Sequence, residues 1–264
     1  MLNTQQFIAD CEAVRSKSPL VHNITNYVAM NIAANGLLAI GASPLMSFYE
    51  EEMDEIVKIA SALVINIGCL DSNEIAGMKA AAEAADKYAK PWVLDPVGAG
   101  ASVVRTQTAL ELIKNHPTII RGNASEIMCL AGAQIASRGV DSSEKSSDAV
   151  DAAKSLAKST GAVVSVSGPV DYITDGERVE TIANGSPLMP MVTAMGCTAS
   201  ALTGAFAAVS PTAFDAALHT MAVMGLAGEF AAKDAKGTGT FGVNFLDELT
   251  VFNAEEAVKS LRQI

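Results

Sequence analysis

Short apolar runs rich in β-branched residues alternate with longer, alanine-rich stretches of helical periodicity over the first two thirds of the chain. The apolar runs predict buried strands at residues 62–68, 91–96, 118–123 and 162–168. The stretches between and after them predict helices near residues 72–88, 106–115, 124–131 and 146–160. Strands and helices that alternate at this spacing are typical of βαβ units. The predicted fold class is therefore α/β, with a mostly parallel central sheet and helices on both faces.

The pattern changes after residue 168. Residues 171–182 predict a β-hairpin that turns at Asp175-Gly176. Farther on, the sequence predicts a helix opened by Cys197, a second helix near residues 211–232 and a helical tail over residues 244–264. No linker, shift in composition or internal repeat divides the chain, so residues 1–264 are expected to form a single domain.

Two long stretches, residues 18–49 and 185–214, contain no Asp, Glu, Lys or Arg. A membrane-spanning helix needs about 20 continuous apolar residues. Asn, Ser, Thr, Gly and Pro interrupt both stretches, so buried helices and turns are expected rather than membrane spans. Frequent Ala, Gly and Ser with few aromatic residues indicate tight helix packing or a large subunit interface.

The chain is acidic, with a net charge of −11 and a pI of about 4.7. This charge argues against nucleic acid as a partner, because phosphate backbones need a basic face. An anionic substrate such as ATP would then need a local positive site or a metal. The four cysteines lack metal-ligand spacing and the amphipathic N-terminus is no secretory signal, so reduced thiols in a cytoplasmic protein are expected.

Within the second uncharged stretch, residues 192–198 form a glycine-containing turn that leads into the apolar segment of residues 199–209. The free N–H groups of a first helical turn and the positive end of the helix dipole together make an anion site. An anion held here would be bound by the backbone, beside the small thiol of Cys197. This combination predicts phosphate chemistry on a small, mostly apolar substrate.

Polar residues also stand where the predicted strands end. Four such points occur: Asp95; Asn123 with Glu126 on the next turn; Ser167 with Gly168; and Gly196 with Cys197. The carboxyl ends of parallel strands meet at one edge of a sheet, so all four points are expected on one rim. The two carboxylates suit Mg²⁺, which prefers oxygen ligands. A metal and a helix N-terminus are the minimum equipment for phosphoryl transfer.

Each of these residues also has a plainer interpretation. Asp95 could cap a turn before Pro96, and Glu126 could interact with a helix dipole. Cys197 could be a small buried apolar residue. Their shared position on one rim favours the functional interpretation.

Three other motifs bear on the function. Residues 237–242 match G-x-G-x-x-G, but they follow a predicted helix rather than a strand, so they are interpreted as a flexible loop that could act as a lid. No P-loop motif occurs, which excludes a P-loop enzyme of the usual form. Residues 22–26 form a polar cluster expected to open an apolar helix, either as an N-cap network around Asn23 or Thr25 or as a polar wall for a substrate. His116 and His219 are interpreted as structural.

Five segments, residues 19–26, 35–46, 63–68, 94–100 and 121–126, resemble the hydroxyethylthiazole kinase family, which is ribokinase-like and acts in thiamine salvage. The resemblance covers nearly the whole chain, and Gly196-Cys197 fits the same pattern. It implies a ribokinase-like domain in which ATP, with Mg²⁺, phosphorylates the primary hydroxyl of 4-methyl-5-(2-hydroxyethyl)thiazole. It also implies a homotrimer with active sites between subunits.

The candidate site residues follow from the resemblance and the rim together. Met46 and Ala194 are implied to contact the thiazole, with Asn23, Thr25 and Gly68 as further substrate-binding candidates. Arg121 and Ser167 are implied to contact ATP, with Asn123 and Gly168 beside them. Asp95 and Glu126 are the metal candidates. Gly196 and Cys197 are the catalytic candidates, and Cys197 stands where most ribokinase-like kinases carry an aspartate base.

The chain departs from the family pattern beside Cys197. The family usually has glycine at the position of Ala194 and a small residue at that of Met195. Alanine is costly there if the turn needs a positive φ, and the Met195 thioether is expected near the thiazole or the anion turn. Ser167 replaces the commoner threonine and keeps the hydroxyl.

The mechanistic hypothesis places the γ-phosphate on the N–H groups of Gly196, Cys197 and Thr198. A helix N-terminus lowers a thiol pKa, so Cys197 is expected to accept a proton. Two other functions stay open at this point. One is a ribokinase-like kinase or dehydratase with a shifted substrate, although the dehydratase family keeps Asp where Cys197 stands; the other is a non-catalytic thiazole or nucleotide binder. A Cys-His hydrolase is the weakest alternative, since only His22 could lie near the rim.

Overall fold

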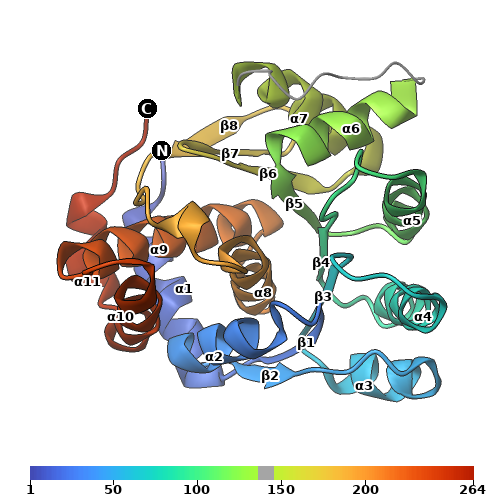
Figure 1. Cartoon of the computed structure of the whole chain (residues 1–264), viewed down its shortest axis with the longest axis horizontal. Coiled ribbons are helices and arrows are strands. Elements are labelled where there is room, and N and C mark those ends of the chain that lie inside the picture. Colours follow the sequence, from blue (N-terminus) through green and yellow to red (C-terminus); the bar gives the residue numbers. More distant parts are fainter. Residues whose placement is uncertain (136–145) are drawn as a thin grey trace.

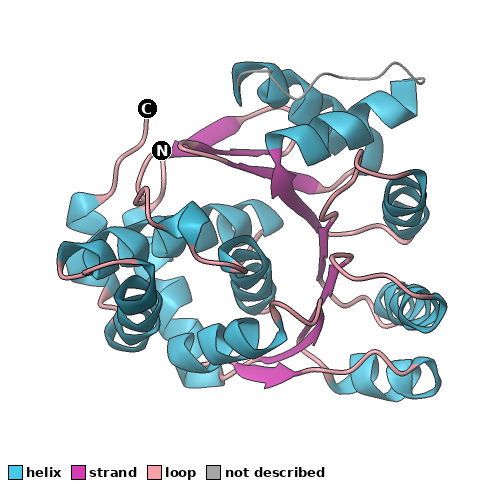
Figure 2. Ribbon diagram, in the orientation of Figure 1, coloured by secondary structure: helices cyan, strands magenta, loops and turns pink. Residues whose placement is uncertain are grey.

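A computed structural model describes residues 1–135 and 146–264, which build one eight-stranded sheet with helices on both sides (Figures 1 and 2). The strands are β1 Leu20–Ile24, β2 Ser43–Leu45, β3 Ala62–Asn66, β4 Trp92–Asp95, β5 Ile119–Asn123, β6 Val163–Ser167, β7 Asp171–Thr174 and β8 Val179–Ile182. Their order in the sheet is β2-β1-β3-β4-β5-β6-β7-β8. The six strands from β2 to β6 in this order are parallel, and the β7–β8 hairpin is antiparallel. The predicted mostly parallel α/β fold is confirmed.

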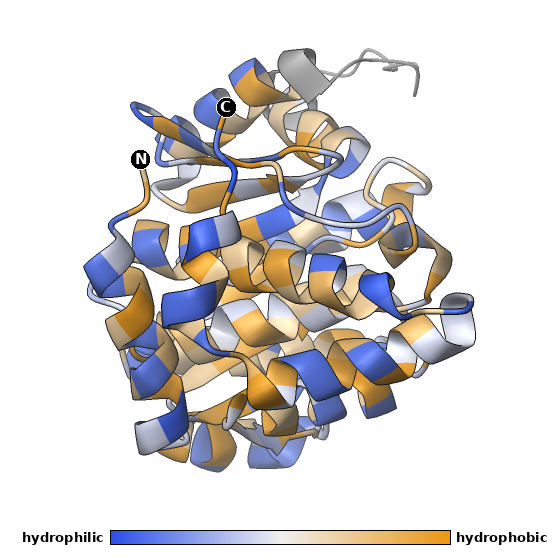
Figure 3. Cartoon of the chain, turned by 90° about the vertical axis from the view of Figure 1, so that its left-hand side faces the viewer, coloured by the Kyte–Doolittle hydropathy of each residue, from blue (hydrophilic) through white to orange (hydrophobic). Residues whose placement is uncertain are grey.

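The helices form two layers, one on each face of the sheet. Helices α3 Met53–Ile59, α4 Ser72–Lys87, α5 Val103–Ile113, α6 Ala124–Ile135 and α7 Ser146–Thr160 lie on the right of the sheet in Figure 1. Helices α1 Thr4–Lys17, α2 Met30–Ile40, α8 Met195–Ala207, α9 Ala213–Lys233, α10 Thr238–Val251 and α11 Ala254–Ala257 lie on its left. Along the outer helices of this second layer, hydrophobic and hydrophilic residues are interspersed (Figure 3).

The sheet divides the apolar core into two clusters. Every residue of β3 is buried. Successive side chains of a strand point to opposite faces, so Val64 packs in the cluster under α8 and α9, whereas Leu63 and Ile65 pack in the cluster under α4 and α5. Strands covered on both faces read as continuous apolar runs, which is why β3 to β6 could be predicted from the sequence.

Helix α8 lies close against the sheet because Gly204 has no side chain. A Cβ atom built on Gly204 would lie 2.4 Å from Cγ2 of Val64 and 3.1 Å from Cγ1 of Val21. Ten of the 13 residues of α8 are buried. The close approach brings the first turn of this uncharged helix to the ends of the central strands.

Three predictions about elements are wrong. Residues 22–24 do not open a helix but belong to strand β1, where the polar His22 and Asn23 are buried. Residues 238–242 are not a loop, since α10 begins at Thr238. Helical spacing lets Phe241 and Phe245 stack in the core, with ring centroids 6.2 Å apart. The tail is not continuously helical, since α10 ends at Val251 and Asn253 caps the separate short helix α11.

The two ends of the chain lie near β8, the strand at one edge of the sheet (Figure 1). Ala183 N–H donates to the Arg262 carbonyl at 2.8 Å, and Thr181 Oγ1 donates to the Ile264 carbonyl at 2.8 Å. The terminal amino group of Met1 pairs with Glu180. Both ends therefore help to cover an edge strand that would otherwise expose unpaired backbone groups.

A buried hydrogen-bonded pair joins helix α1 to α9. Asp10 Oδ2 and His219 Nδ1 are 2.8 Å apart, and the two side chains are 2% and 0% exposed. Gln6 Nε2 donates to the other carboxylate oxygen of Asp10 at 2.7 Å. His219 thus lies in the core, away from the strand ends, where the structural interpretation had placed it.

Within the part of the chain that the structure describes, no helix combines the length and the apolar character needed to cross a membrane.

Candidate functional site

The four polar points expected on one rim do meet there. Asn66 at the end of β3 pairs in register with Asp95 at the end of β4, and Asn123 at the end of β5 pairs with Ser167 at the end of β6. The first turn of α8 joins them, because Arg121 Nη1 on β5 donates to the Gly196 carbonyl at 2.8 Å. The carboxyl edge of the parallel sheet therefore carries a continuous polar site.

A chain of hydrogen bonds runs through this site from Cys197 to Ser200. Asn26 Nδ2 lies 3.4 Å from Cys197 Sγ and donates to Asn66 Oδ1 at 3.0 Å. Asn66 Nδ2 donates to Asp95 Oδ2 at 2.7 Å, and Ser200 Oγ donates to the same oxygen at 2.7 Å. Buried networks of this kind hold their members in one geometry when every group has a partner. Since Cys197 and Ser200 are both part of α8, the helix closes the chain of hydrogen bonds into a ring. We call its five residues the polar ring: Cys197, Asn26, Asn66, Asp95 and Ser200.

Asp95 is the charged member of the polar ring and is 2% exposed. Burial raises the pKa of its carboxyl group to about 6, against the lowering effects of the Arg121 guanidinium and of the two hydrogen bonds. Its side chain makes none of the turn-capping bonds that the plainer interpretation required; its partners are Asn66 and Ser200. Perturbed carboxyl groups at a strand edge are typical of functional sites.

Glu126 has both a structural and an electrostatic position. Its Oε2 accepts from Asn123 N–H at 2.8 Å while Asn123 Oδ1 accepts from Glu126 N–H at 2.9 Å, which forms a reciprocal cap at the start of α6. Its Oε1 accepts from Gly98 N–H at 2.8 Å. Glu126 therefore performs the helix-start role of the plainer interpretation and also holds the loop after Asp95 in place.

The first turn of α8 carries free backbone donors, one residue earlier than predicted. Thr198 N–H already donates to the Ala194 carbonyl at 2.8 Å, so it is not available to an anion, and the predicted use of this group is wrong. The preceding N–H groups, those of Met195, Gly196 and Cys197, have no carbonyl four residues back inside the helix. Gly196 is exposed and Cys197 is half-buried, so these donors face the rim.

Ala194 caps α8 in the left-handed region, with φ 65° and ψ 8°. The backbone at this position therefore does adopt the conformation that favours glycine, which the resemblance had implied could be needed here. Met195 is 6% exposed and packs in the apolar cluster under α8 and α9. The expectation that its thioether lies near the substrate is wrong, because the side chain turns into the core.

Replacing Ala194 by glycine is expected to stabilise the protein by about 1 kcal/mol, because alanine with a positive φ is strained. The melting temperature should rise by roughly 2–4 °C. Ala89 is a matched control, since it also has a positive φ, 49°, and lies outside the rim. Calorimetry should show a similar gain for Ala89→Gly and Ala194→Gly, and steady-state kinetics should change only for Ala194→Gly. A lower melting temperature for Ala194→Gly would contradict the strain.

The Cys197 thiol is not activated in this structure. Burial raises its pKa, and the charge of Asp95 raises it further, whereas the Asn26 and Asn66 amides and Arg121 lower it by less. The prediction of a lowered pKa is wrong, because burial and the neighbouring Asp95 carboxylate raise it. Near neutral pH Cys197 is a thiol and not a thiolate.

The end of β6 lies on the same rim and brings a further carboxylate. Ser167 Oγ donates to the Gly122 carbonyl at 3.3 Å, and Gly168 N–H donates to Asp171 Oδ1 at 3.0 Å. Burial raises the pKa of Asp171 to about 6. The predicted nucleotide residues Ser167 and Gly168 are thus in place, but the Gly168 N–H is already engaged.

The predicted substrate wall lies around the end of β1. Asn23 and Thr25 are 1% and 6% exposed, and their side-chain polar atoms have no hydrogen-bond partner among the described residues. Gly68 packs on the Asn26 amide so closely that a Cβ atom would lie 2.5 Å from its nitrogen. Met46 is half-buried, and the carbonyl of the next residue, Ser47, lies 2.9 Å from His22 Nε2.

His22 is therefore engaged with the segment that carries Met46 and not with Cys197. Burial lowers the pKa of the His22 ring, so it is neutral at pH 7. No contact of this ring with the thiol exists among the described residues, which leaves the Cys-His hydrolase alternative without its catalytic pair.

Three residues that build the site, Asn66, Ser200 and Arg105, were not among the candidates, whereas Asn26 belongs to the polar cluster of residues 22–26. Asn66 is the last residue of β3, and its position at a strand end was the signal that could have found it. Ser200 and Arg105 gave no such signal. The Arg105 guanidinium donates to the carbonyls of Ile67, Gly68 and Val97 at 2.7, 2.9 and 3.0 Å, and so ties the loops after β3 and β4 together.

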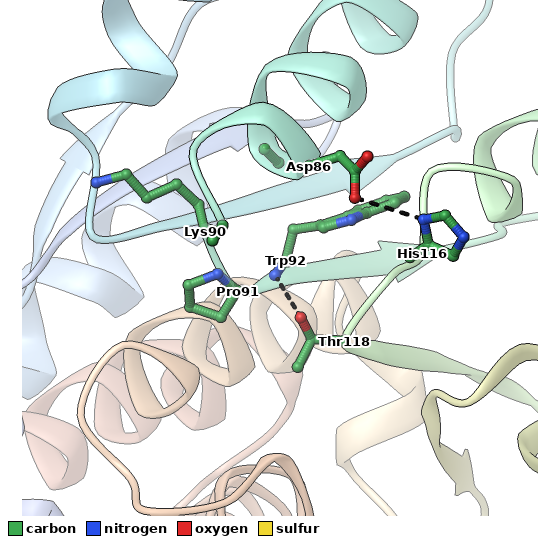
Figure 4. A pocket seen from close by; sticks show the side chains of 8 residues that line it. Asp86, Lys90, Pro91, Trp92, His116 and Thr118 are labelled. Carbon is green, nitrogen blue, oxygen red and sulfur yellow. Dashed lines mark hydrogen bonds and ion pairs between the residues drawn. The ribbon is translucent and has the colours of Figure 1, made fainter.

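A separate pocket of about 380 Å³ lies at the opposite edge of the sheet, where β4 and β5 begin (Figure 4). Asp86 and His116 form an ion pair at 3.4 Å on one side of it, and Trp92 N–H donates to Thr118 Oγ1 at 3.0 Å in its floor. None of the candidate site residues lines this pocket. Ligands of open parallel sheets bind at the carboxyl ends of the strands, so the rim remains the candidate site.

The mostly parallel sheet with an edge hairpin and helices on both faces has the ribokinase-like fold. A ribokinase-like superfamily protein from Enterococcus faecalis shares the fold, with a TM-score of 0.65 and 13% identity over 97% of this chain and 95% of that one. The sequence model of the "HK: Hydroxyethylthiazole kinase family" matches residues 11–255. The chain therefore belongs to the hydroxyethylthiazole kinase family.

Two relatives place the chain within this family. A hydroxyethylthiazole kinase from Brachyspira hyodysenteriae is 50% identical over 260 residues, which cover 98% of each chain. The solved structure of a hydroxyethylthiazole kinase protein from Pyrococcus horikoshii has a TM-score of 0.91 and 39% identity, over 98% of this chain and 99% of that one. The predicted family and fold are thus confirmed over nearly the full length.

Proposed function

We propose that the protein transfers the γ-phosphoryl group of ATP to the primary hydroxyl of 4-methyl-5-(2-hydroxyethyl)thiazole, a step of thiamine biosynthesis and salvage. The observation that carries this proposal is the start of α8. Its free N–H groups lie directly beside the polar ring, in a chain that belongs to the hydroxyethylthiazole kinase family. Backbone donors preorganised around a transferred phosphoryl group stabilise the charge that develops there.

The acceptor would lie between β1 and the start of α8. The unpaired, buried polar groups of Asn23 and Thr25 would then gain hydrogen bonds to it, which offsets the cost of burying them without a partner. Met46, Ala194 and Gly68 supply small or flexible apolar surface around the ring. The hydroxyl group of the substrate would point towards Cys197.

Mg²⁺ fits the residues on this rim only as a weakly held ion. Both Glu126 oxygens accept backbone hydrogen bonds, and Asp95 Oδ2 accepts two. Among the described residues, no group of three or more His, Cys, Asp or Glu side chains could hold a metal. Mg²⁺ commonly uses one or two carboxylates with waters and substrate phosphates. When bound, it would neutralise phosphate charge, with Asp95 and Glu126 holding it directly or through water.

ATP would approach from the ends of β5 and β6. Arg121 supplies the positive charge, while Ser167 and the exposed Asn123 supply hydrogen-bonding groups at the edge. Gly168 would contact the nucleotide through its Cα surface, because its N–H donates to Asp171.

Cys197→Ala is expected to lower kcat by on the order of 10²-fold or less, because a protonated thiol is a poor base and a loose transition state needs little base help. Initial rates of ADP formation measure this. Cys11→Ala is the matched control, since Cys11 lies on α1, away from the rim. Complete loss of turnover in a folded, ATP-binding Cys197→Ala protein would contradict the expectation.

The release of ADP from ATP-Mg²⁺ tests the proposed function. It is measured in four parallel reactions, with the thiazole alcohol, with hydroxymethylpyrimidine, with pyridoxal and without an acceptor. Release that depends on the thiazole alcohol supports it. No turnover, with the thiazole still raising the melting temperature, would make the protein a binder. Turnover with another alcohol would mean a kinase with a shifted substrate.

The proposal includes a homotrimer with active sites between subunits. In the single chain, Tyr27, Val28 and Leu38 are 60%, 64% and 59% exposed around α2 and its approach, next to the proposed substrate wall. Large apolar side chains grouped on a surface are typical of an interface. Sedimentation equilibrium would give the mass of the assembly.

A further inference from the structure

Arg121 lies in an unusual position for a residue whose only task is to hold a nucleotide. It is 6% exposed, and its side chain crosses from β5 to the first turn of α8. There Nη1 donates to the Gly196 carbonyl at 2.8 Å and to Ser200 Oγ at 3.3 Å, and it lies 4.0 Å from Asp95 Oδ2. One guanidinium nitrogen, Nη1, thus faces both the helix and the polar ring.

The carbonyl that Arg121 holds belongs to the peptide group between Gly196 and Cys197. A peptide group is planar and trans, so its N–H points away from its carbonyl. Fixing the Gly196 carbonyl therefore fixes the direction of the Cys197 N–H. That N–H is one of the free donors of the helix start, because the first helical bond begins at Thr198.

The contact also changes the strength of this donor. A hydrogen bond from a charged group is stronger than a neutral one, and a polarised carbonyl makes the N–H of the same peptide a better donor. Residues 185–214 contain no charged side chain. The positive charge at the first turn of α8 must therefore come from another element, and β5 supplies it.

We propose that Arg121 is a positioning residue that orients and polarises the Gly196–Cys197 peptide, so that the Cys197 N–H can bind the transferred phosphoryl group. The proposal rests on the proposed phosphoryl transfer and assigns to Arg121 a role that differs from contact with ATP. A nucleotide contact alone would act mainly on the KM for ATP. A positioning role acts on the transition state and therefore on kcat.

The sequence offers a direct view of this peptide. Only two Gly-Cys pairs occur in the chain, Gly68-Cys69 and Gly196-Cys197. Labelling glycine with ¹³C at the carbonyl and cysteine with ¹⁵N therefore gives two carbonyl-coupled amide signals. The Gly68 carbonyl is also held by an arginine, Arg105, at 2.9 Å. Arg105→Lys is thus a matched control that should move only the signal of the other pair.

The test compares Arg121→Lys and Arg121→Met with the wild type by NMR and by steady-state kinetics. We expect both variants to shift the Gly196–Cys197 signal, to leave the Gly68–Cys69 signal in place, and to lower kcat at least about tenfold. The lysine variant keeps the charge and serves if the methionine variant does not fold. A Gly196–Cys197 signal that stays in place, or an unchanged kcat with a raised KM for ATP, would overturn the proposal.

The phosphoryl transfer and the positioning role of Arg121 can be contradicted separately. If the wild type shows no thiazole-dependent ADP release, the proposed function fails, and the NMR signals still decide whether Arg121 controls the peptide. If the wild type is active and the signals do not respond to Arg121, only the positioning role fails.

Discussion

Replacing Asp95 by asparagine is expected to lower kcat by on the order of 10³-fold and, above pH 6, to make the protein more stable. The activity loss follows from the position of this carboxylate, which anchors the polar ring and is one of the two carboxylates proposed to hold Mg²⁺. The Mg²⁺ concentration that gives half of the maximal rate should also rise. The stability gain follows from the cost of keeping this carboxylate charged while it is buried.

The pH range of this gain follows from the raised pKa. The pKa of Asp95 is about 6 in the folded protein against 3.8 for an unperturbed group, so the folded state binds the proton more tightly. This contribution to stability is fully present below pH 3.8 and is lost as the pH rises through 6. Asparagine carries no charge at any pH. The difference between variant and wild type should therefore be small at pH 4 and reach roughly 3 kcal/mol above pH 7.

Chemical denaturation at several pH values, with Mg²⁺ titrations of the initial rate, measures both effects. Asp171→Asn is a matched control for stability, because burial raises the pKa of Asp171 to about 6 as well. Its denaturation curves should change in the same direction with pH, and its requirement for Mg²⁺ should not change. An Asp95→Asn protein with wild-type kcat and wild-type Mg²⁺ dependence would remove Asp95 from the site.

Asp10→Ala is expected to destabilise the fold by about 3–4 kcal/mol. A buried donor that loses its acceptor costs its full desolvation free energy, and here His219 and Gln6 both lose the Asp10 carboxylate. The melting temperature should fall by roughly 6–16 °C. Because α1 and α9 contact the rim only through the core, kcat at 25 °C should stay near that of the wild type.

The difference in stability between Asp10→Ala and the wild type should become smaller at acidic pH. Burial alone would raise the pKa of Asp10, but hydrogen bonds, led by that from His219, outweigh it and lower the pKa below 3.8. The stabilising contribution is therefore present above pH 3.8 and is lost as the pH falls through the lowered pKa. The difference in melting temperature between variant and wild type should therefore be constant well above pH 3.8 and should shrink as the pH falls below it. A difference that does not change with pH would mean that packing, and not the Asp10 carboxylate, holds α1 in place.

The sequence predicted those parts of the fold that depend on local pattern. Strands β3 to β6 are buried on both faces and so appear as apolar runs, and the β7–β8 hairpin turns at Asp175-Gly176 as expected. Strand β1 was missed because His22 and Asn23 interrupt its apolar run, although both side chains are buried in the structure. Buried polar residues conceal a strand because their partners, such as the Ser47 carbonyl, lie elsewhere in the chain.

In the site, too, local features could be predicted from the sequence and features that depend on tertiary contacts could not. The end of a parallel strand is a local property, so Asp95, Asn123 and Ser167 could be placed on the rim in advance. The pKa of Cys197 could not be predicted, because the helix N-terminus is visible in the sequence and the opposing effects of burial and Asp95 are not. The Arg121 contact with Gly196 joins residues 75 positions apart and depends on how α8 docks.

The polar ring also has a consequence for how the protein is made. Its closing contact joins Asn26 to Cys197 across 171 positions, and Ser200 reaches Asp95 across 105. Such long-range closures come late and slowly in folding, because the chain entropy between the partners must be lost first. On a nascent chain the polar ring is therefore still incomplete when β1 to β6 have been synthesised. Ligand binding then becomes possible only after residue 200 has left the exit tunnel, so substrate and ATP can stabilise the finished protein but cannot guide the early steps of its synthesis.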